Sequence, residues 1–414
     1  MRIFEISSSR MSSRKKSILR FVIFLSVSTI SISILFTFML KKDSNLKANF
    51  LQNEQQPNRP RNTRKINDNQ KTILLSQRNP PSPTPPIVMT KRNCDFPVDI
   101  VYTWVNGSEK EWSDRKNKIE RKDRVRVSRS TEKSRYIDIG ELMFNLRGIE
   151  KNIPWFRRIF IITDNQIPNW IRLDHPNLTF VNHTDIIPQE FLPVYNSNNI
   201  EFHMHNIPGL SEHFIYLNDD VFIARPLNKT DFFTENGIPI IPVCEYDWIA
   251  FRNETEKYLD RKSLRNDMGS VQYRLTSARS FEVYYTKFRK AVNYRSIHGY
   301  MTFTKTLMKY MWDNFPMEIG EVEKHKFRDY TDVNIPSLSI FCGIGSGLAV
   351  PILNDNINHL LSLDSMFQVK LIDFNYTNYR SFCLNSGERT TNHVRKAAKA
   401  FLNNYMPNKS SFEK

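Results

Sequence analysis

A short apolar run that ends in two adjacent carboxylates constrains this chain more than any other segment. Residues 214–223 read FIYLNDDVFI, so a run of Phe, Ile, Tyr and Leu is followed at once by Asn218, Asp219 and Asp220. The run predicts a buried strand, because aromatic and branched residues bounded by turn formers are typical of one. The Asn-Asp-Asp triplet is then either a solvated turn or a metal site at the carboxyl end of an α/β strand, since hard divalent cations prefer oxygen ligands.

Strand and helix patterns alternate along the chain beyond residue 93. Runs rich in β-branched and aromatic residues predict strands over residues 98–105, 158–163, 179–182, 214–217 and 238–243. Apolar residues at helical spacing predict helices over 196–207, 281–292 and 307–315. Another helix is expected to begin at Asp138, because Asp138 and Glu141 match a capping box. The alternation favours an α/β fold, in which ligands bind where the core strands end.

Two further patterns resemble known sites without matching them. Gly343, Gly345 and Gly347 have part of the spacing of a dinucleotide fingerprint, but no strand precedes them, so we expect a loop. His203 and His205 lie two residues apart and point in different directions on a helix, so a zinc site built on this pair is not expected.

An uncharged run near the N-terminus predicts a membrane span. Residues 21–40, FVIFLSVSTISISILFTFML, are twenty positions without a charge, which is long enough to cross the hydrocarbon core as a helix. Basic residues are concentrated before the run, so the positive-inside rule places residues 1–20 in the cytosol as a tail. A cleaved signal peptide is the competing interpretation, but the run exceeds the usual apolar region of such peptides. We therefore expect a single-pass type II signal anchor, with the bulk of the protein in the lumen.

The segment after the span has the composition of a disordered stem. Residues 41–93 are polar and contain five prolines between positions 80 and 86, with Phe50 as the only aromatic residue, so they cannot bury a core. We expect residues 94–395 to form the catalytic domain and residues 396–414 a C-terminal tail. Residues 1–40 carry a net charge of +5 and residues 41–93 of +8, which leaves only +3 of the total +16 for the rest. Nucleic-acid binding is therefore not expected.

Cysteines and glycosylation sequons agree with a lumenal location. The four cysteines, Cys94, Cys244, Cys342 and Cys383, allow three full pairings in an oxidising compartment and have no C-x-x-C spacing. Asn-x-Ser/Thr sequons begin at Asn106, Asn177, Asn182, Asn228, Asn253, Asn375 and Asn408. Together with the anchor, these features favour the Golgi membrane.

Long blocks of the chain resemble the Stealth family of sugar-phosphate transferases. They read DIVYTWVNGSE at 99–109, RYIDIGELMFNLRGIEKNIPWFRRIFIITDNQIPNW at 135–170 and IPGLSEHFIYLNDDVF at 207–222; a later block contains His298 and HKFRDYTD at 325–332. The family includes the N-acetylglucosamine-1-phosphotransferase that marks lysosomal enzymes and bacterial capsule-polymer hexose-1-phosphate transferases. The resemblance implies a Rossmann-like, nucleotide-sugar-transferase-type mixed sheet flanked by helices, with a more helical C-terminal half.

The resemblance also implies a reaction and a set of catalytic residues. An acceptor hydroxyl would attack the β-phosphorus of a UDP-sugar, releasing UMP and forming a phosphodiester. Asp219 and Asp220 would bind Mg²⁺ or Mn²⁺, with Asp220 nearest the reacting phosphate. His298 would act as general base and Arg328 would stabilise the phosphoryl oxygens with its planar fork of donors.

Further residues are expected to bind the substrate. They are Trp104, Asn106, Gly107, Arg135, Asp138, Glu201, His205 and Asn218. Glu201 and His205 are included because residues at i and i+4 share a helix face. Asp138 and Asn106 also have plain structural alternatives, as a helix N-cap and as a turn former.

Two departures from the family pattern leave open the role of the fourth block and the preference for an acceptor. Gly299 and Tyr300 follow His298 where the family has an x-Pro pair, and Ser386 replaces the last carboxylate of a Cys-Leu-Asn-Asp block. We expect transfer of GlcNAc-1-phosphate to a glycan or glycoprotein acceptor, by an enzyme that could form a homodimer. The alternatives are a metal-dependent Golgi glycosyltransferase that releases UDP and a non-catalytic glycan-binding relative.

Overall fold

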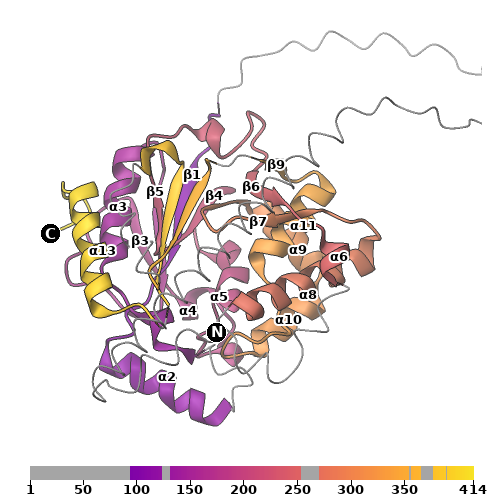
Figure 1. Ribbon diagram of the computed structural model, residues 1–414, viewed down its shortest axis with the longest axis horizontal. Coiled ribbons are helices and arrows are strands. Elements are labelled where there is room, and N and C mark those ends of the chain that lie inside the picture. Colours follow the sequence, from indigo (N-terminus) through magenta and orange to yellow (C-terminus); the bar gives the residue numbers. More distant parts are fainter. Residues whose placement is uncertain (1–93, 124–130, 253–269, 354–355, 365–375, 388) are drawn as a thin grey trace, which may run out of the picture. The chain divides into compact units, whose positions relative to one another are not determined.

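The computed structural model describes residues 94–123, 131–252, 270–353, 356–364, 376–387 and 389–414 (Figure 1). The predicted cytosolic tail, the membrane span at 21–40 and the stem lie outside these residues. Among the helices within these ranges, none is both long and apolar enough to span a bilayer.

A five-stranded sheet in the order β3-β2-β1-β4-β8 forms the centre of the fold. Its strands are β1 (Val98–Thr103), β2 (Ile159–Thr163), β3 (Leu178–Asn182), β4 (His213–Asn218) and β8 (Met301–Thr304). The first four run parallel to their neighbours and β8 runs antiparallel to β4. The predicted mixed α/β sheet is therefore confirmed, and so are the four predicted strands that it contains.

Apolar side chains cover both faces of this sheet. Along β1, Val101 packs into one hydrophobic cluster while Ile100 and Tyr102 pack into another, as the two-residue period of a strand requires. Phe214 and Ile215 of β4 divide between the same two clusters. Burial on both faces is usual for parallel strands, and it explains why the runs are almost continuously apolar.

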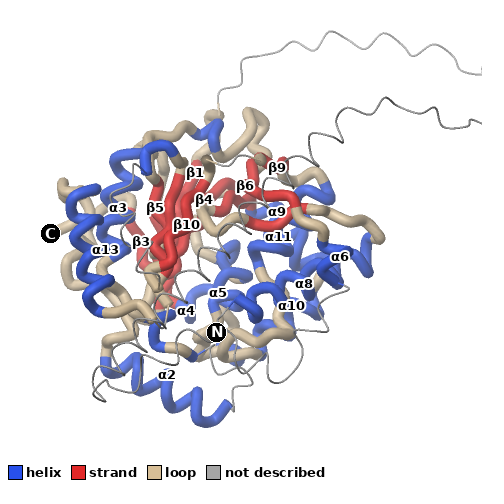
Figure 2. Tube along the Cα trace, in the orientation of Figure 1, coloured by secondary structure: helices blue, strands red, loops and turns tan. Residues whose placement is uncertain are grey.

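Helices enclose the central sheet from two sides, as Figure 2 shows. On one side lie α3 (Glu141–Asn152) and α13 (Asn392–Tyr405). On the other lie α8 (Ser270–Phe288), α9 (Lys305–Asn314), α10 (Pro316–Lys324) and α11 (Ile335–Ser346), so the C-terminal half is more helical, as predicted. The remaining α-helices are α2 (Lys110–Asp123), α4 (His183–Ile186), α5 (Ser197–Phe202) and α6 (Trp248–Arg252).

Two small sheets adjoin the central one. The first has the order β10-β11-β5, from β5 (Val221–Ile223), β10 (Asn358–Ser362) and β11 (Ser381–Asn385). The second has the order β7-β6-β9, from β6 (Ile240–Glu245), β7 (Tyr294–Ser296) and β9 (Val350–Ile352). Asp219 and Asp220 lie between β4 and β5, so this acidic pair links the central sheet to the first small sheet.

The predicted capping box at Asp138 is wrong. The helix begins at Glu141, and Gly140 occupies the N-cap with a left-handed φ of 98°. Asp138 Oδ1 accepts a hydrogen bond from the Gly140 nitrogen at 2.7 Å, while Glu141 Oε2 accepts from the Ile139 nitrogen at 2.6 Å. Glycine adopts this conformation without a steric cost, which moves the helix start beyond the aspartate.

The single helix predicted over residues 196–207 is interrupted. The α-helix α5 ends at Phe202, and a 3-10 turn follows at Met204–Asn206. Between them, the His203 ring bonds to the Asn199 carbonyl at 2.8 Å and to Glu323 Oε1 at 3.0 Å. This buried pairing fixes His203 at the point where the helix ends.

The loop predicted at Gly343–Gly347 is instead the end of α11, with Gly347 as a left-handed C-cap. A Cβ at Gly345 would lie 1.9 Å from the Tyr284 hydroxyl, so the glycine permits close packing between α11 and α8. The predicted tail at 396–414 also belongs to the folded domain, because α13 runs through residue 405 and Arg147 pairs with Glu413 at 2.6 Å.

Candidate active site

The parallel pairing of β1 and β4 brings two polar segments to one edge of the central sheet. Thr103, the last residue of β1, lies opposite Asn218, the last residue of β4. Residues 104–107 and Asp219–Asp220 therefore leave the sheet side by side, at the carboxyl edge where α/β folds bind ligands.

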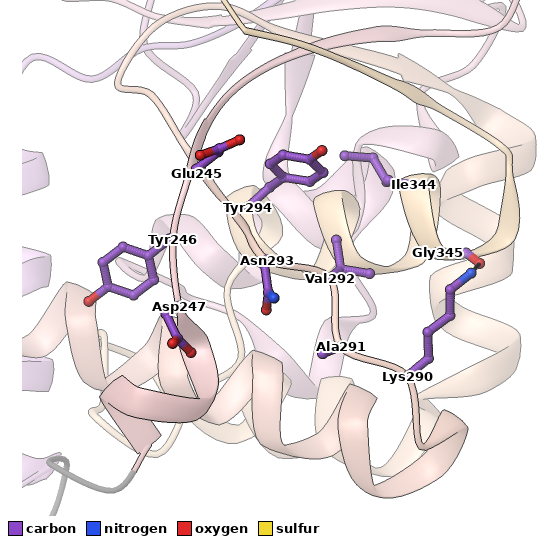
Figure 3. Close-up of a pocket in the computed structure, with 10 residues that line it drawn as sticks. All are labelled: Glu245, Tyr246, Asp247, Lys290, Ala291, Val292, Asn293, Tyr294, Ile344 and Gly345. Carbon is purple, nitrogen blue, oxygen red and sulfur yellow. Dashed lines mark hydrogen bonds between the residues drawn. The ribbon is translucent and has the colours of Figure 1, made fainter. Parts of the chain in front are cut away.

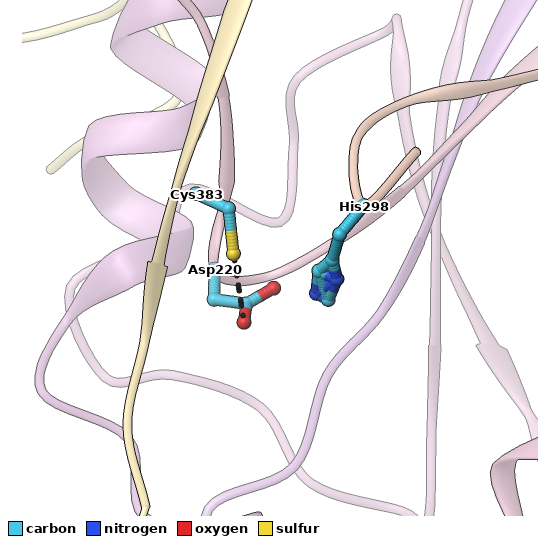
Figure 4. Close-up of side chains that lie close together, drawn as sticks. All are labelled: Asp220, His298 and Cys383. Carbon is cyan, nitrogen blue, oxygen red and sulfur yellow. Dashed lines mark hydrogen bonds between the residues drawn. The ribbon is translucent and has the colours of Figure 1, made fainter. Parts of the chain in front are cut away.

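Asp220 lies within reach of two further metal-ligand side chains, His298 and Cys383 (Figure 4). Its Oδ2 accepts a hydrogen bond from the Cys383 thiol at 3.3 Å, and its buried Oδ1 has no partner among the described residues. One ligand atom from each of the three residues lies within 4.8 Å of the others. The structure thus brings together two of the predicted catalytic residues, Asp220 and His298.

Strand pairing accounts for the position of Cys383. On β11 this residue lies opposite Val221, the first residue of β5, so its side chain reaches the carboxylate that immediately precedes β5. His298 comes from the loop between β7 and β8, and its carbonyl accepts a hydrogen bond from the Asn358 side chain. Residues that are distant in the sequence therefore hold the side chains of Cys383 and His298 beside Asp220.

Two more carboxylates, Asp138 and Glu141, lie close enough to Asp219 to interact with it electrostatically. Desolvation, and then the charges of Asp220 and Asp138, raise the pKa of Asp219 well above its usual range. Burial and the charge of Asp219 do the same to the pKa of Glu141. The Asn145 amide donates to the Asp219 carbonyl at 2.6 Å and so fixes the turn.

This donor set fits a hard divalent cation such as Mg²⁺ or Mn²⁺. Asp219 and Asp220 offer adjacent carboxylates with few compensating positive groups around them, and Asp220 Oδ1 is buried without a hydrogen bond from the described part of the chain. Oxygen-rich, anionic surroundings of this kind suit such ions. A bound cation would also offset the mutual repulsion of the carboxylates.

A second group of polar residues surrounds Tyr216 of β4. Its hydroxyl lies 2.7 Å from Asn218 Oδ1, 2.9 Å from Thr103 Oγ1 and 3.2 Å from Glu201 Oε1. Burial raises the pKa of the Glu201 carboxyl to about 7, although the charge of Arg328 opposes the shift. The Tyr216 hydroxyl and the Glu201 carboxyl therefore connect the end of β4 to the surroundings of Arg328.

Arg328 is held at the N-terminus of α5. Its Nε and Nη2 donate to Ser197 Oγ at 3.1 and 2.5 Å. Its loop is fixed by the buried Asp332, which accepts from the Asn196 side chain at 3.0 Å and from His325 Nδ1 at 2.6 Å. In the described part of the chain no hydrogen bond or ion pair joins Arg328 to Asp220. Hydrogen bonds lead from Arg328 through Ser197, Glu201 and Tyr216 as far as Asn218, two residues before Asp220.

The turn after β1 carries three of the predicted substrate-binding residues. Gly107 donates to the Tyr136 carbonyl at 2.6 Å, and a Cβ at Gly107 would lie 2.4 Å from that oxygen. This close approach holds Arg135 and its 3-10 turn beside the turn at Asn106. Asn106 Oδ1 accepts from Ser108 N at 3.1 Å and from Ser108 Oγ at 2.6 Å, so the side chain forms the turn itself.

Two predicted substrate-binding residues are not placed as expected. His205 lies beyond the interruption after α5 and packs on Trp312 at 5.9 Å, and burial lowers its pKa to about 4. It does not share a helix face with Glu201. Trp104 is only 4% exposed and packs in the hydrophobic core, where its buried Nε1 has no hydrogen-bond partner among the described residues.

Sequence reasoning missed several residues of this site. They are Glu141, Tyr216, Ser197 and Cys383. The capping-box pattern gives Glu141 a structural role, and the sequence predicts Cys383 only as a possible disulfide partner and as the first residue of the Cys-Leu-Asn-Asp block. All four cysteines are free thiols in the structure. The one available signal was the position of Cys383 in a block that resembles the family.

A cavity of about 650 Å³ lies elsewhere in the domain (Figure 3). Its lining includes Glu245, Asp247 and Tyr294, and Lys290 donates to the Gly345 carbonyl at its margin at 2.7 Å. It shares no residue with the site around Asp220, so we do not place the nucleotide there.

The raised pKa of Glu201 predicts a specific pH dependence of stability. Because the pKa rises from 4.5 to about 7 on folding, this group stabilises the fold fully below pH 4.5, and its contribution is lost as the pH rises through 7. As the pH rises over this range, the free energy of unfolding should fall less in the Glu201→Gln variant than in the wild type. The difference between the two proteins should be at most roughly 3 kcal/mol. Urea midpoints at pH 5 and pH 8 measure the difference, with Glu245→Gln, at an exposed position, as control. Equal pH dependence in wild type and Glu201→Gln would contradict the prediction.

Comparisons with known proteins give consistent matches. Residues 96–124 match Stealth protein CR1, conserved region 1, and residues 135–241 match Stealth protein CR2, conserved region 2. The capsular polysaccharide phosphotransferase fcs1 of Haemophilus influenzae is 30% identical over 322 residues, covering 76% of this chain and 85% of that protein. The capsular polysaccharide phosphotransferase WcwK of Streptococcus pneumoniae is 30% identical over 335 residues, covering 77% and 99%. A crystal structure of the galactosyltransferase LgtC covers 76% of this chain and 96% of its own at 13% identity, with a TM-score of 0.38.

Proposed function

The chain belongs to the Stealth family of sugar-phosphate transferases, and we propose that it transfers GlcNAc-1-phosphate from a UDP-sugar to a glycan hydroxyl, releasing UMP. The phosphotransferase class follows from the relatives, whereas the donor and acceptor are part of the proposal. The observation that carries it is the approach of His298 to Asp220 at the carboxyl edge of the sheet. There a base and a metal-binding carboxylate are available to one reacting phosphate.

The chemistry requires that one bond forms as another breaks at the β-phosphorus. The acceptor oxygen bonds to this phosphorus, and the bond to the bridging oxygen breaks, so UMP departs with the electron pair. His298 takes the hydroxyl proton, a task that suits an imidazole at neutral pH. Arg328 donates to the phosphoryl oxygens, Ser197 positions its guanidinium group, and Glu201 interacts with the charge of that group.

Asp219 and Asp220 would hold the divalent cation. When bound, Mg²⁺ or Mn²⁺ would neutralise charge on the pyrophosphate. Asn218 at the end of β4 and the turn at Asn106 after the neighbouring strand β1 flank this position. Asp138 lies close enough to Asp219 for its charge to raise the pKa of Asp219. These residues are suited to orient the nucleotide sugar beside the carboxylates.

We place the enzyme in the Golgi membrane with its catalytic domain in the lumen. The support is the uncharged run at residues 21–40, the basic residues before it and the sequons beyond it. A glycosidase mobility shift together with protease protection in intact microsomes tests this arrangement. A mature N-terminus beyond Leu40 would indicate a cleaved signal instead.

The identity of the released nucleotide tests the reaction. Incubation of the purified protein with UDP-GlcNAc, an oligomannose acceptor and Mn²⁺ should yield UMP and an acid-labile phosphodiester on the glycan, because the bond broken lies between the two phosphates. Chromatography of the nucleotides and mass spectrometry of the glycan measure both products. Accumulation of UDP with a simple glycoside would identify a glycosyltransferase, and binding of the glycan without nucleotide release would indicate a non-catalytic relative.

A further inference from the structure

We propose that Asp220, His298 and Cys383 form a binding site for a thiophilic divalent cation, Zn²⁺, which inhibits transfer. The three side chains supply a carboxylate oxygen, an imidazole nitrogen and a thiol sulfur, with one ligand atom from each within 4.8 Å of the others. This donor set differs from the oxygen ligands proposed for Mg²⁺ or Mn²⁺. The inhibitory effect rests on the proposed function, whereas the binding does not.

The geometry is close to that of a zinc site. Ligand atoms at ordinary zinc distances in a tetrahedron lie roughly 3.3–3.7 Å apart. Cys383 Sγ and Asp220 Oδ2 are 3.3 Å apart in the structure. Figure 4 shows the thiol directed at the Asp220 carboxylate and the His298 ring beside the same carboxylate. Small side-chain rotations would therefore bring all three ligand atoms to one ion.

The surroundings of Asp220 and Cys383 favour the binding of an ion. The Asp220 Oδ1 atom is buried and has no hydrogen-bond donor within the described residues, so a cation would satisfy it. Cys383 is buried on β11, its thiol donates a hydrogen bond to Asp220 Oδ2, and the nitrogen of the next residue, Leu384, donates to the Asp220 carbonyl, so the strand holds the sulfur in place. On binding, the thiol loses its proton to the buffer and the thiolate bonds to zinc, with one proton released for each ion bound.

Such an ion would interfere with two residues of the reaction. It would occupy Asp220, which the proposed function assigns to Mg²⁺ or Mn²⁺, and it would occupy the nitrogen with which His298 accepts the hydroxyl proton. A thiolate ligand makes the site selective for Zn²⁺, because soft sulfur ligands favour Zn²⁺ over Mg²⁺ and Mn²⁺. Excess Mg²⁺ should therefore displace zinc poorly.

Cobalt binding tests the site without reference to activity. The purified full-length chain, reduced with a phosphine that does not supply a thiol, is titrated with Co²⁺ and followed by absorption. We expect one Co²⁺ per chain with a sulfur-to-cobalt charge-transfer band, which Zn²⁺ should abolish. Cys383→Ser should remove the band and weaken Zn²⁺ binding by roughly 100-fold or more, because loss of an outer-shell partner alone costs about 10- to 100-fold. Cys244→Ser, at a half-buried thiol away from Asp220, should keep the band.

Inhibition is measured separately, with each variant compared with its own rate before zinc is added. The zinc concentration that halves transfer should rise at least 10-fold in Cys383→Ser and stay unchanged in Cys244→Ser. Absence of the cobalt band in the wild type, or its persistence in Cys383→Ser, would overturn the site. A normal band in a protein that transfers no sugar phosphate would contradict the proposed function alone, whereas a normal band with zinc-insensitive transfer would overturn the inhibitory role.

Discussion

Replacing Asp220 with asparagine is expected to lower sugar-phosphate transfer by roughly 10³-fold, because the neutral amide cannot supply the negative charge that holds a divalent cation beside the reacting phosphate. The substitution keeps the size of the side chain and one oxygen that can accept the hydrogen bond from Cys383. It also removes one of the charges that raise the pKa of Asp219. The fold should therefore be retained, and its stability without metal should not fall.

Two measurements separate loss of chemistry from loss of structure. Initial rates over a Mn²⁺ titration should show little activity at any concentration, and the thermal shift that Mn²⁺ produces in the wild type should be much smaller in Asp220→Asn. Asp247→Asn is a matched control, since this exposed carboxylate lines the separate cavity and not the site. Near-normal turnover of a folded Asp220→Asn variant would reduce Asp220 to a turn residue.

Local patterns were sufficient to predict the central sheet, because its strands are buried on both faces and their sequences are almost uninterrupted apolar runs. The predicted helix boundaries were wrong where the conformation or pairing of a single residue started or ended a helix at another position than the sequence pattern indicated. Gly140 moved the start of α3 beyond Asp138, and the pairing of His203 with Glu323 accompanied the end of α5. Gly345 looked like part of a loop, although its missing side chain is what allows α11 to pack on Tyr284.

The site could be predicted only in part for a related reason. Asp219 and Asp220 are adjacent in the chain and follow a recognisable strand, so the sequence identifies them directly. His298 reaches Asp220 through a loop that no local pattern specifies, and only the family resemblance suggested it. Cys383 arrives through the pairing of β11 with β5, which joins segments far apart in the sequence. Contacts of this kind depend on the whole fold.

The second large effect is expected on turnover when Arg328 is replaced. Arg328→Lys is expected to lower kcat by roughly 10²-fold or more, although the positive charge is retained. The guanidinium group uses Nε and Nη2 to hold Ser197 Oγ and donates to no other side chain among the described residues, so its remaining donor positions could meet the phosphoryl oxygens of the proposed substrate. A lysine ammonium cannot reproduce this planar arrangement, so it would bind either Ser197 or a phosphoryl oxygen in an altered position.

The comparison of rate with stability decides whether Arg328 acts on the substrate. The urea midpoint of Arg328→Lys should change little, because its loop is held by Asp332 and by the bond from Gln272 to the Arg328 carbonyl. Ser197→Ala, which leaves the guanidinium group but removes the acceptor that positions it, should cost less activity than Arg328→Lys. Arg279→Lys on the exposed side of α8 is the matched control. If Arg328→Lys lost stability in proportion to activity, the arginine would support the loop at residues 325–332 and would not act on the transferred phosphate. If the variant lost neither, the planar guanidinium group would be needed for neither role.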